Sequence, residues 1–385
     1  MSYIADTYKR FNLKFVKGEG CYLFTEKNEK YLDLVGGIAV CALGHAHHEF
    51  NLMLKNQIDR ILHVSNLYHI PPQETLAEKI CKISFAEKVF FCNSGAEANE
   101  AAIKLVKKHG FTISPLKQKI LSCTNSFHGR TTGALSITGQ EKYRKDFGSL
   151  LPDVDFVEFN NIDSLNEKFD KNVAGIFVEI IQGEGGINVI DANFLKEIRK
   201  LCNSFNAILV YDEVQTGIGR TGKFFAYEHF KIEPDIMSLA KALGGGVPIG
   251  ALAGKKKFME ILSPGSHAST FGGNYLASAA GCAVINIIEK HNILDNVNKA
   301  GEYFLQNLKA LSEKYSFVKK VKGMGLLIGL EIDFPVSEII NKLIENKVLT
   351  VAAGEKVLRF VPPLIITNEE IDFAIKKLET IFKTF

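Results

Sequence analysis

The sequence predicts an α/β protein: a large domain with a mostly parallel sheet flanked by helices, and a smaller α+β domain after it. The chain has 385 residues, which is more than one small core usually organises and is typical of two domains. Between residues 89 and 240, apolar runs of strand length alternate with helical patterns, which indicates parallel strands joined by helices. Beyond residue 291 the pattern changes to short strands among helices. These three observations define the predicted fold class.

The composition is that of a globular protein, with 46% hydrophobic and 23% charged residues. A net charge of +3, without a dominant Lys/Arg block, gives no indication of binding to nucleic acid or to an anionic membrane. No apolar run reaches the ~18 residues of a membrane span, and residues 1–17 lack the apolar core of a secretory signal. Seven cysteines without C-x-x-C spacing favour reduced thiols in the cytoplasm.

The N-terminal segment predicts short strands at residues 21–24 and 31–34, then a helix from about His48 to Ile61. The units of the large sheet come next. Their predicted strands cover residues 89–92, 119–123, 173–178, 207–211 and 236–240, and their predicted helices cover 96–108 and 192–203. A long apolar helix at 276–291 is expected to leave this domain.

The C-terminal part completes the predicted organisation. Its helices are expected at residues 296–315 and 337–346, and its strands at 318–321, 325–330, 348–351 and 357–360. A final helix opens at Thr367, and Glu370 three residues later gives a capping-box pattern. We therefore predict an N-terminal segment (1–45) that packs with the small domain, a large domain (46–280) and a small C-terminal domain (281–385).

Two charged side chains end predicted buried strands. Asp212 follows the apolar run 207–211, and Lys241 follows the run 236–240. Ligands of parallel sheets bind beyond the carboxyl ends of the strands, where Glu179 also stands. A buried acid and a buried amine are each costly unless something compensates them. Pyridoxal phosphate uses both groups, because it binds a lysine covalently and needs an acidic partner for its ring nitrogen.

Two loops carry further candidate ligands. The run Ser94-Gly95-Ala96 lies between a strand and a helix, where free N–H groups could bind phosphate; an ordinary capped helix is the alternative. In the second loop, Phe127 could stack on a flat ring and Arg130 could clamp a carboxylate. A loop aromatic and a surface arginine are the simpler alternative there.

Two other patterns suggest functions that the sequence does not support. Residues 217–222 match the dinucleotide pattern G-x-G-x-x-G, but a polar segment separates them from the strand and no clear helix follows. His45, His47 and His48 cannot easily converge on one metal ion, and no acid or Cys cluster stands nearby. We therefore expect neither a nicotinamide-binding fingerprint nor a metal centre.

Four segments carry a family resemblance. They are YDEVQTGIGRTG at 211–222, SLAKALGGG at 238–246, SFHGRT at 126–131 and STFGGN at 269–274. In these segments, and from Gly18 to the C-terminal helix, the chain resembles the class III aminotransferases. His48 and Tyr275 depart from the pattern, since the family often carries Pro there. The resemblance implies the fold-type I architecture, pyridoxal 5'-phosphate as the cofactor, and a homodimer with shared active sites.

The resemblance also implies roles for individual residues. Lys241 and Asp212 would be catalytic, the first by binding the cofactor covalently and the second by meeting its ring nitrogen. The other cofactor contacts would come from Ser94, Gly95, Ala96, Phe127, Val214, Gln215 and, in the neighbouring subunit, Thr270. The substrate contacts would come from Arg130, Ser269 and the pair Glu184 and Arg359.

The same resemblance implies transfer of the δ-amino group of N-acetylornithine to 2-oxoglutarate in arginine biosynthesis. Succinyldiaminopimelate, ornithine and 4-aminobutyrate are alternative donors. A non-catalytic, cofactor-binding regulator on the same fold is a further alternative, against which the presence of both Lys241 and Asp212 argues. The expected partners are therefore small-molecule substrates and a second copy of the chain.

Overall fold

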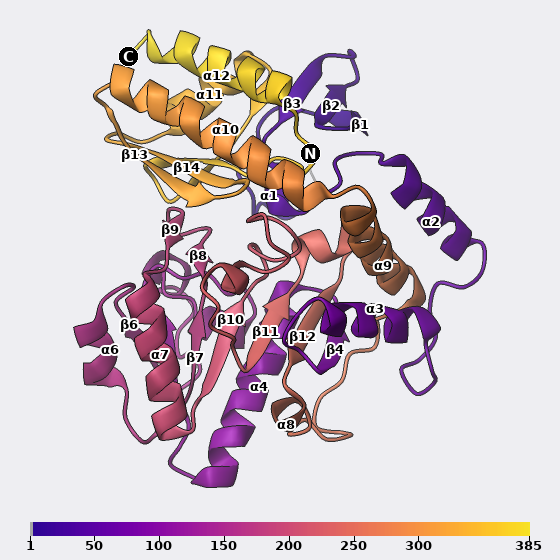
Figure 1. The fold of residues 1–385 in the computed structure, drawn as a ribbon, viewed down its shortest axis with the longest axis vertical. Coiled ribbons are helices and arrows are strands. Elements are labelled where there is room, and N and C mark those ends of the chain that lie inside the picture. The colour runs from indigo at the N-terminus through magenta and orange to yellow at the C-terminus, as the bar shows by residue number, and fades with distance from the viewer. Residues whose placement is uncertain (1–2) are drawn as a thin grey trace.

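A seven-stranded sheet forms the centre of the lower part of the molecule in Figure 1, and the computed structural model describes residues 3–385. Its strands, in spatial order, are β4 (Lys88–Cys92), β12 (Gly250–Gly254), β11 (Ile236–Leu239), β10 (Ile208–Asp212), β7 (Val173–Val178), β5 (Lys119–Cys123) and β6 (Val154–Val157). Strands β11, β10, β7, β5 and β6 pair in parallel, whereas β12 pairs antiparallel with β11 and β4. The prediction of a mostly parallel sheet is confirmed.

Both faces of this sheet are buried. The helices of this part are α4 (Gly95–Ile113), α5 (Thr132–Ser136), α6 (Ile162–Lys168), α7 (Ala192–Phe205) and α8 (Lys256–Met259). On β10, Ile208 and Val210 belong to the apolar cluster of α4, while Leu209 and Tyr211 belong to the core on the α7 side. This alternation follows from the pleat of the strand. A strand covered on both faces needs the continuous apolar run that the sequence contains.

Helix α9 (Tyr275–Lys290) connects the two parts of the molecule (Figure 1). It packs against α2 (His48–Ile58) and α3 (Pro71–Lys82), and its buried residues lie on most of its circumference. The Asn274 side chain caps its first turn by accepting the N–H of Ala277 at 2.9 Å. The next helix, α10 (Ile293–Lys314), crosses the upper part in Figure 1.

The upper part contains a second, antiparallel sheet. Its strands, in spatial order, are β13 (Val318–Met324), β14 (Leu327–Ile332), β17 (Val357–Phe360) and β16 (Val351–Ala353). Helices α10, α11 (Ser337–Glu345) and α12 (Asn368–Phe382) pack together beside it (Figure 1). The capping box of α12 is confirmed, because Thr367 and Glu370 exchange side-chain and backbone hydrogen bonds of 2.9 and 3.4 Å.

The N-terminal strands join this upper part. A third sheet contains β1 (Phe15–Glu19), β2 (Tyr22–Thr25), β3 (Lys30–Asp33) and β15 (Val348–Leu349), and β3 pairs in parallel with β15. The short elements that remain are α1 (Gly36–Ala39), η1 (Glu141–Tyr143), β8 (Ile181–Gln182), β9 (Asn188–Val189), η2 (Ala226–His229) and η3 (Lys241–Gly244). No helix within residues 3–385 is long and apolar enough to cross a bilayer.

The two rejected patterns have structural roles in the fold. Residues 217–222 form turns, and no α-helix follows them directly, so the context of a dinucleotide fingerprint is absent from this segment. His45 lies 2.8 Å from Asp33 Oδ2, and His47 caps α2 by accepting the N–H of Phe50. Across residues 3–385, no group of three or more His, Cys, Asp or Glu side chains could hold a metal ion.

Candidate active site

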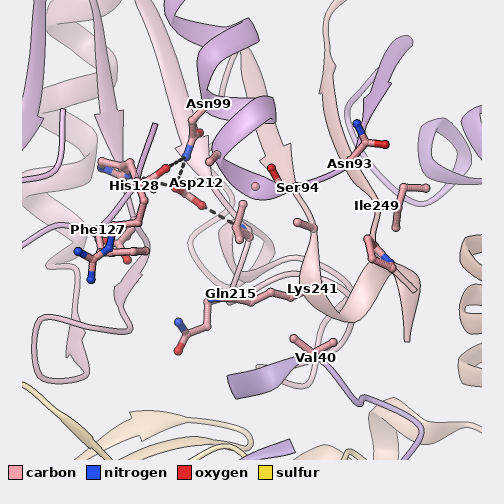
Figure 2. Close-up of a pocket in the computed structure, with 18 of the residues that line it drawn as sticks. Val40, Asn93, Ser94, Asn99, Phe127, His128, Asp212, Gln215, Lys241 and Ile249 are labelled. Atoms are coloured by element: carbon pink, nitrogen blue, oxygen red, sulfur yellow. Dashed lines mark hydrogen bonds and ion pairs between the residues drawn. The ribbon is translucent and has the colours of Figure 1, made fainter. Parts of the chain in front are cut away.

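A cavity of about 410 Å³ lies beyond the carboxyl ends of β10 and β11 (Figure 2). It is the place where ligands bind to doubly wound sheets, because the loops after the strands diverge there. Nine of the residues to which the sequence analysis assigned a site role line it: Ser94, Gly95, Ala96, Phe127, Arg130, Asp212, Val214, Gln215 and Lys241. The fold therefore brings together side chains that are separated by up to 147 positions, from Ser94 to Lys241.

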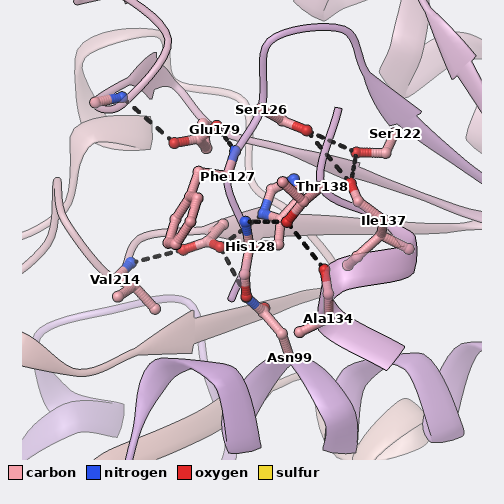
Figure 3. Close-up of polar contacts among 12 residues, drawn as sticks. Asn99, Ser122, Ser126, Phe127, His128, Ala134, Ile137, Thr138, Glu179 and Val214 are labelled. Carbon is pink, nitrogen blue, oxygen red and sulfur yellow. Dashed lines mark hydrogen bonds and ion pairs between the residues drawn. The ribbon is translucent and has the colours of Figure 1, made fainter. Parts of the chain in front are cut away.

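Asp212 ends β10 and is fixed by three donors. Its Oδ2 atom lies 2.8 Å from Asn99 Nδ2 and 2.7 Å from His128 Nδ1, and its Oδ1 atom accepts the N–H of Val214 at 3.0 Å (Figures 2 and 3). Burial opposes a charged imidazole, but the hydrogen bond and charge of Asp212 outweigh it and raise the pKa of His128. His128 and two amide groups thus stabilise a carboxylate that is 5% exposed.

Sequence reasoning did not assign roles to Asn99 and His128. Asn99 stands four residues after Gly95 on α4, so both face the cavity from one side of the helix. His128 is held through its backbone: its N–H donates to Thr138 Oγ1 at 3.0 Å, and its carbonyl accepts Asn99 Nδ2 at 2.7 Å (Figure 3). The helical spacing from Gly95 was the available signal for Asn99, whereas nothing in the sequence pairs His128 with Asp212.

Lys241 follows β11 and opens the turn η3. Its φ of +47° lies in the left-handed region, which is unfavourable for a residue other than glycine and concentrates at functional sites. Within residues 3–385, Lys241 Nζ makes no hydrogen bond and no ion pair, and Figure 2 shows the side chain at the cavity. Burial lowers the pKa of Lys241, although the charge of Glu184 opposes this effect. A lysine that releases its proton easily can act as a nucleophile or a base.

The N-terminus of α4 forms another wall of the cavity. Ser94 caps the helix by accepting the N–H of Glu97 at 3.2 Å. Gly95 allows the Val214 side chain to pack closely against the start of the helix, because a Cβ atom at position 95 would lie 2.7 Å from Cγ1 of Val214. The first amides of a helix have no partner inside the helix, and the helix dipole favours an anion at this end. This wall therefore fits a phosphate group.

Glu179 is a further cavity residue to which the sequence assigned no role. Its Oε2 atom accepts the N–H of Phe127 at 3.0 Å, and Oε1 lies 3.4 Å from the N–H of Gly183 (Figure 3). Burial raises the pKa of Glu179 to about 8. The side chain thus ties the loop that carries Phe127 to the loop that follows β8.

Glu184 and Arg359 adjoin the cavity without lining it. They form an ion pair in which Arg359, on β17, is 2% exposed and Glu184 is 22% exposed. Arg359 Nη1 also donates to the carbonyl of Gly183 at 3.0 Å and to Gln215 Oε1 at 3.2 Å. Burial favours protonation of Glu184, but the charge and hydrogen bond of Arg359 outweigh it and lower the pKa of Glu184. Gln215 links this pair to the cavity.

Ser269 and Thr270 lie elsewhere in the single chain. Both line a second cavity, of about 500 Å³, with His63 and Asn66 among its other residues. Thr270 is exposed, and Ser269 Oγ lies 3.2 Å from Nδ2 of Asn93, a residue that does line the first cavity. The fold of one chain therefore brings Ser269 to the edge of the first cavity and leaves Thr270 on the surface.

Comparisons with known proteins show the family of the chain. The family model "Aminotransferase class-III" matches residues 3–382. The chain is 49% identical to the acetylornithine aminotransferase of Caldanaerobacter subterraneus subsp. tengcongensis over 381 residues, 98% of this chain and 97% of the relative. It is 47% identical to the acetylornithine aminotransferase of Aquifex aeolicus over 382 residues, 99% of this chain and 100% of the relative.

The similar solved structures are also aminotransferases. The N-acetylornithine aminotransferase of Stenotrophomonas maltophilia K279a superposes with a TM-score of 0.86 at 34% identity, covering 98% of this chain and 97% of that one. An ornithine aminotransferase of Toxoplasma gondii, described with partial occupancy of PLP at its active site, superposes with a TM-score of 0.94 at 32% identity, covering 99% and 92%. The fold-type I prediction is confirmed by these neighbours. This chain belongs to the class III aminotransferases.

Proposed function

We propose that this aminotransferase moves the δ-amino group of N-acetylornithine to 2-oxoglutarate, giving N-acetylglutamate 5-semialdehyde and glutamate, as a step of arginine biosynthesis. The observation that carries the proposal is the placement of Lys241 and Asp212 in one cavity with the N-terminus of helix α4. The names of the relatives, at 45 to 49% identity over almost the whole chain, support N-acetylornithine as the donor.

The cavity residues fit pyridoxal phosphate. The capped helix start at Ser94, Gly95 and Ala96 would bind the phosphate, and Phe127 and Val214 would contact the two faces of the ring. Gln215 would complete the ring contacts on the side of Val214. When bound, this cofactor supplies a store for the electron pair left on the substrate carbon, which amino-group exchange requires.

Two residues of the chain would then transfer the proton and stabilise the charge. Lys241 would hold the cofactor, and its Nζ would take a proton from the donor carbon that bears the amino group. The negative Asp212, fixed by Asn99 and His128, would stabilise positive charge on the ring nitrogen. Its three hydrogen-bond donors hold the carboxylate in one orientation.

The two substrates place different charges beside the reacting carbon. The donor carries a methylene there, and Arg130 with Ser269 would bind its distant α-carboxylate. 2-Oxoglutarate carries a carboxylate there, which Arg359 would bind. Glu184 pairs with Arg359, so it would neutralise the arginine for the donor and give way to 2-oxoglutarate.

Glu184→Gln tests this exchange of partners. A neutral amide leaves the Arg359 charge uncompensated while the donor is bound, so the donor half-reaction should slow by roughly tenfold or more relative to the 2-oxoglutarate half-reaction. Single-turnover kinetics of the two halves measure this ratio. Glu338→Gln removes a surface ion pair with Lys342 and should change neither half. Equal slowing of both halves by Glu184→Gln would contradict the exchange.

A donor series tests the proposed function directly. The purified protein should use N-acetylornithine with a larger kcat/KM than ornithine or 4-aminobutyrate, because Arg130 suits an α-carboxylate and burial of an unpaired ornithine α-ammonium is costly. Succinyldiaminopimelate also carries an acylated amine beside a carboxylate and belongs in the same series. A clear preference for ornithine or 4-aminobutyrate would overturn the assignment.

A homodimer with shared active sites is part of this proposal. Leu67, Tyr68 and Phe271 are 88%, 70% and 60% exposed beside the second cavity, and exposed apolar groups of this kind mark interfaces. A second copy covering this surface would let Thr270 reach the cofactor phosphate of its neighbour. Sedimentation should give twice the mass of one chain, and Phe271→Asp should shift the protein toward the monomer and lower its affinity for the cofactor. A catalytically competent monomer would contradict this arrangement.

The same proposal includes a location and a domain division. Seven cysteines, all of them free, suit a reducing compartment, so we place the protein in the cytoplasm. We divide the chain at residues 45 and 280, because β3 pairs with β15 of the upper part and α9 leads out of the large sheet.

A further inference from the structure

Arg130 is an unpaired cation at the edge of the cavity. Its side chain is exposed, and within residues 3–385 its guanidinium makes no ion pair and no hydrogen bond. A long side chain in water samples many rotamers, and binding a carboxylate in two-point geometry requires one of them. A residue that restricts this guanidinium before the ligand arrives would therefore increase affinity for the carboxylate.

Two aromatic rings provide this restriction. The Arg130 guanidinium carbon lies 4.0 Å from the centre of the Tyr143 ring and 5.4 Å from the centre of the Phe127 ring. The two rings meet edge to face, with centres 5.7 Å apart and planes at 81°. An aromatic face attracts the flat cation without using its N–H groups. The guanidinium is thus held by its face, and its donors stay available.

The segment that carries Tyr143 is anchored to the loop of Phe127 and Arg130. Gly139 donates its N–H to Ser126 Oγ at 2.9 Å and accepts the N–H of Asn125 at 3.2 Å. A Cβ at Gly139 would lie 2.1 Å from the carbonyl oxygen of Cys123, so this approach requires glycine. From there η1 leads directly to Tyr143, which is half-buried.

We propose that Tyr143 is a positioning residue for substrate recognition, holding the Arg130 guanidinium ready for the α-carboxylate of the amine donor. The inference rests on the proposed function, since it assigns Arg130 to that carboxylate. The ring, rather than the hydroxyl, performs the task, because the Tyr143 hydroxyl has no hydrogen-bond partner among the described residues. Phe127 is the second wall, but it also faces the cofactor site, so Tyr143 is the residue that can be changed selectively.

The experiment compares two donors that differ in one group. N-Acetylputrescine is N-acetylornithine without the α-carboxylate. With Tyr143→Leu, kcat/KM for N-acetylornithine should fall roughly three- to tenfold, mainly through KM, while kcat/KM for N-acetylputrescine stays unchanged. Tyr143→Phe should restore the wild-type values. Lys142→Ala, which removes an exposed neighbour 4.8 Å from the same ring, is the matched control and should behave as wild type.

A binding measurement gives a readout that does not depend on turnover. N-Acetylnorvaline carries the α-carboxylate and the acetyl group but no δ-amine, so it binds without reacting. Calorimetry with the cofactor-loaded protein should give a Kd roughly three- to tenfold higher for Tyr143→Leu than for wild type or Tyr143→Phe.

The outcomes separate this inference from the proposed function. If wild type neither uses N-acetylornithine nor binds N-acetylnorvaline, the proposed function fails first. If wild type does both and Tyr143→Leu matches it, or if Tyr143→Leu weakens both donors equally, the positioning role is overturned. Loss of affinity in Tyr143→Phe would place the effect on the hydroxyl and would also overturn the argument.

Discussion

Lys241→Ala is expected to abolish amino-group transfer, with a loss of at least ~10⁴-fold in kcat. The change removes the residue that we propose as both the covalent anchor of the cofactor and the base that moves the substrate proton, and general acid–base catalysis alone contributes ~10²–10⁴-fold. Within residues 3–385, no other lysine lines the cavity beyond β10 and β11, so no neighbour can take over. Borohydride should no longer fix the cofactor to the protein, and the visible absorbance of the lysine-bound form should disappear.

Two companion variants make this test specific. Lys241→Arg keeps a positive charge but supplies a group that stays protonated, so it should be as inactive as Lys241→Ala. Lys257→Ala removes an exposed lysine that rests on Phe258, and it should leave activity and cofactor attachment unchanged. If borohydride still reduced a protein–cofactor bond in Lys241→Ala, the anchor would be a different lysine.

Asp212→Asn is expected to lower kcat by ~10²–10³-fold, because it removes the preorganised negative charge that we propose faces the ring nitrogen. A second readout is the His128 imidazole. Its pKa is raised in the folded protein because Asp212 outweighs the effect of burial, so the substitution should lower it. NMR titration of the histidine ring protons measures this change. A histidine whose pKa is raised in the folded state adds to the free energy of unfolding at pH values below its unfolded pKa, near ~6.5, and this contribution is lost as the pH rises through its folded pKa. The free energy of unfolding of Asp212→Asn should therefore not show this decrease with pH.

Asp235→Asn is the matched control for this variant. Asp235 is also a buried carboxylate, 4% exposed, and accepts hydrogen bonds of 2.9 Å from Arg199 and from the N–H of Leu209. It stands at the opposite, amino-terminal end of β11, away from the cavity. Both substitutions should destabilise the fold, but only Asp212→Asn should reduce catalysis and shift His128. Near-normal turnover in Asp212→Asn would contradict the ring-nitrogen role.

Much of the large sheet could be predicted from the sequence, because its strands are covered on both faces. Strand β10 consists of consecutive apolar residues that end at a charged one, and this pattern marks both the strand and its functional end. Strand β12 was not predicted. Its sequence, residues 250–254, contains two glycines and no β-branched residue, so its strand conformation comes from pairing with β11 and β4. Helix α3 was also missed, although Pro71 at its start is a recognised signal.

By itself, the sequence determined the fold class, the family and the two charged residues at strand ends to which we assign the chemistry, because apolar periodicity and local motifs are properties of neighbouring positions. The tertiary structure decided which distant groups complete them. His128 and Asp212 are 84 positions apart, and Arg359 lies 175 positions from Glu184, so no local pattern could pair them. Their contacts arise because crossover connections bring strand ends to one cavity and β17 of the upper sheet lies next to it, where buried charges are stable only when they have partners.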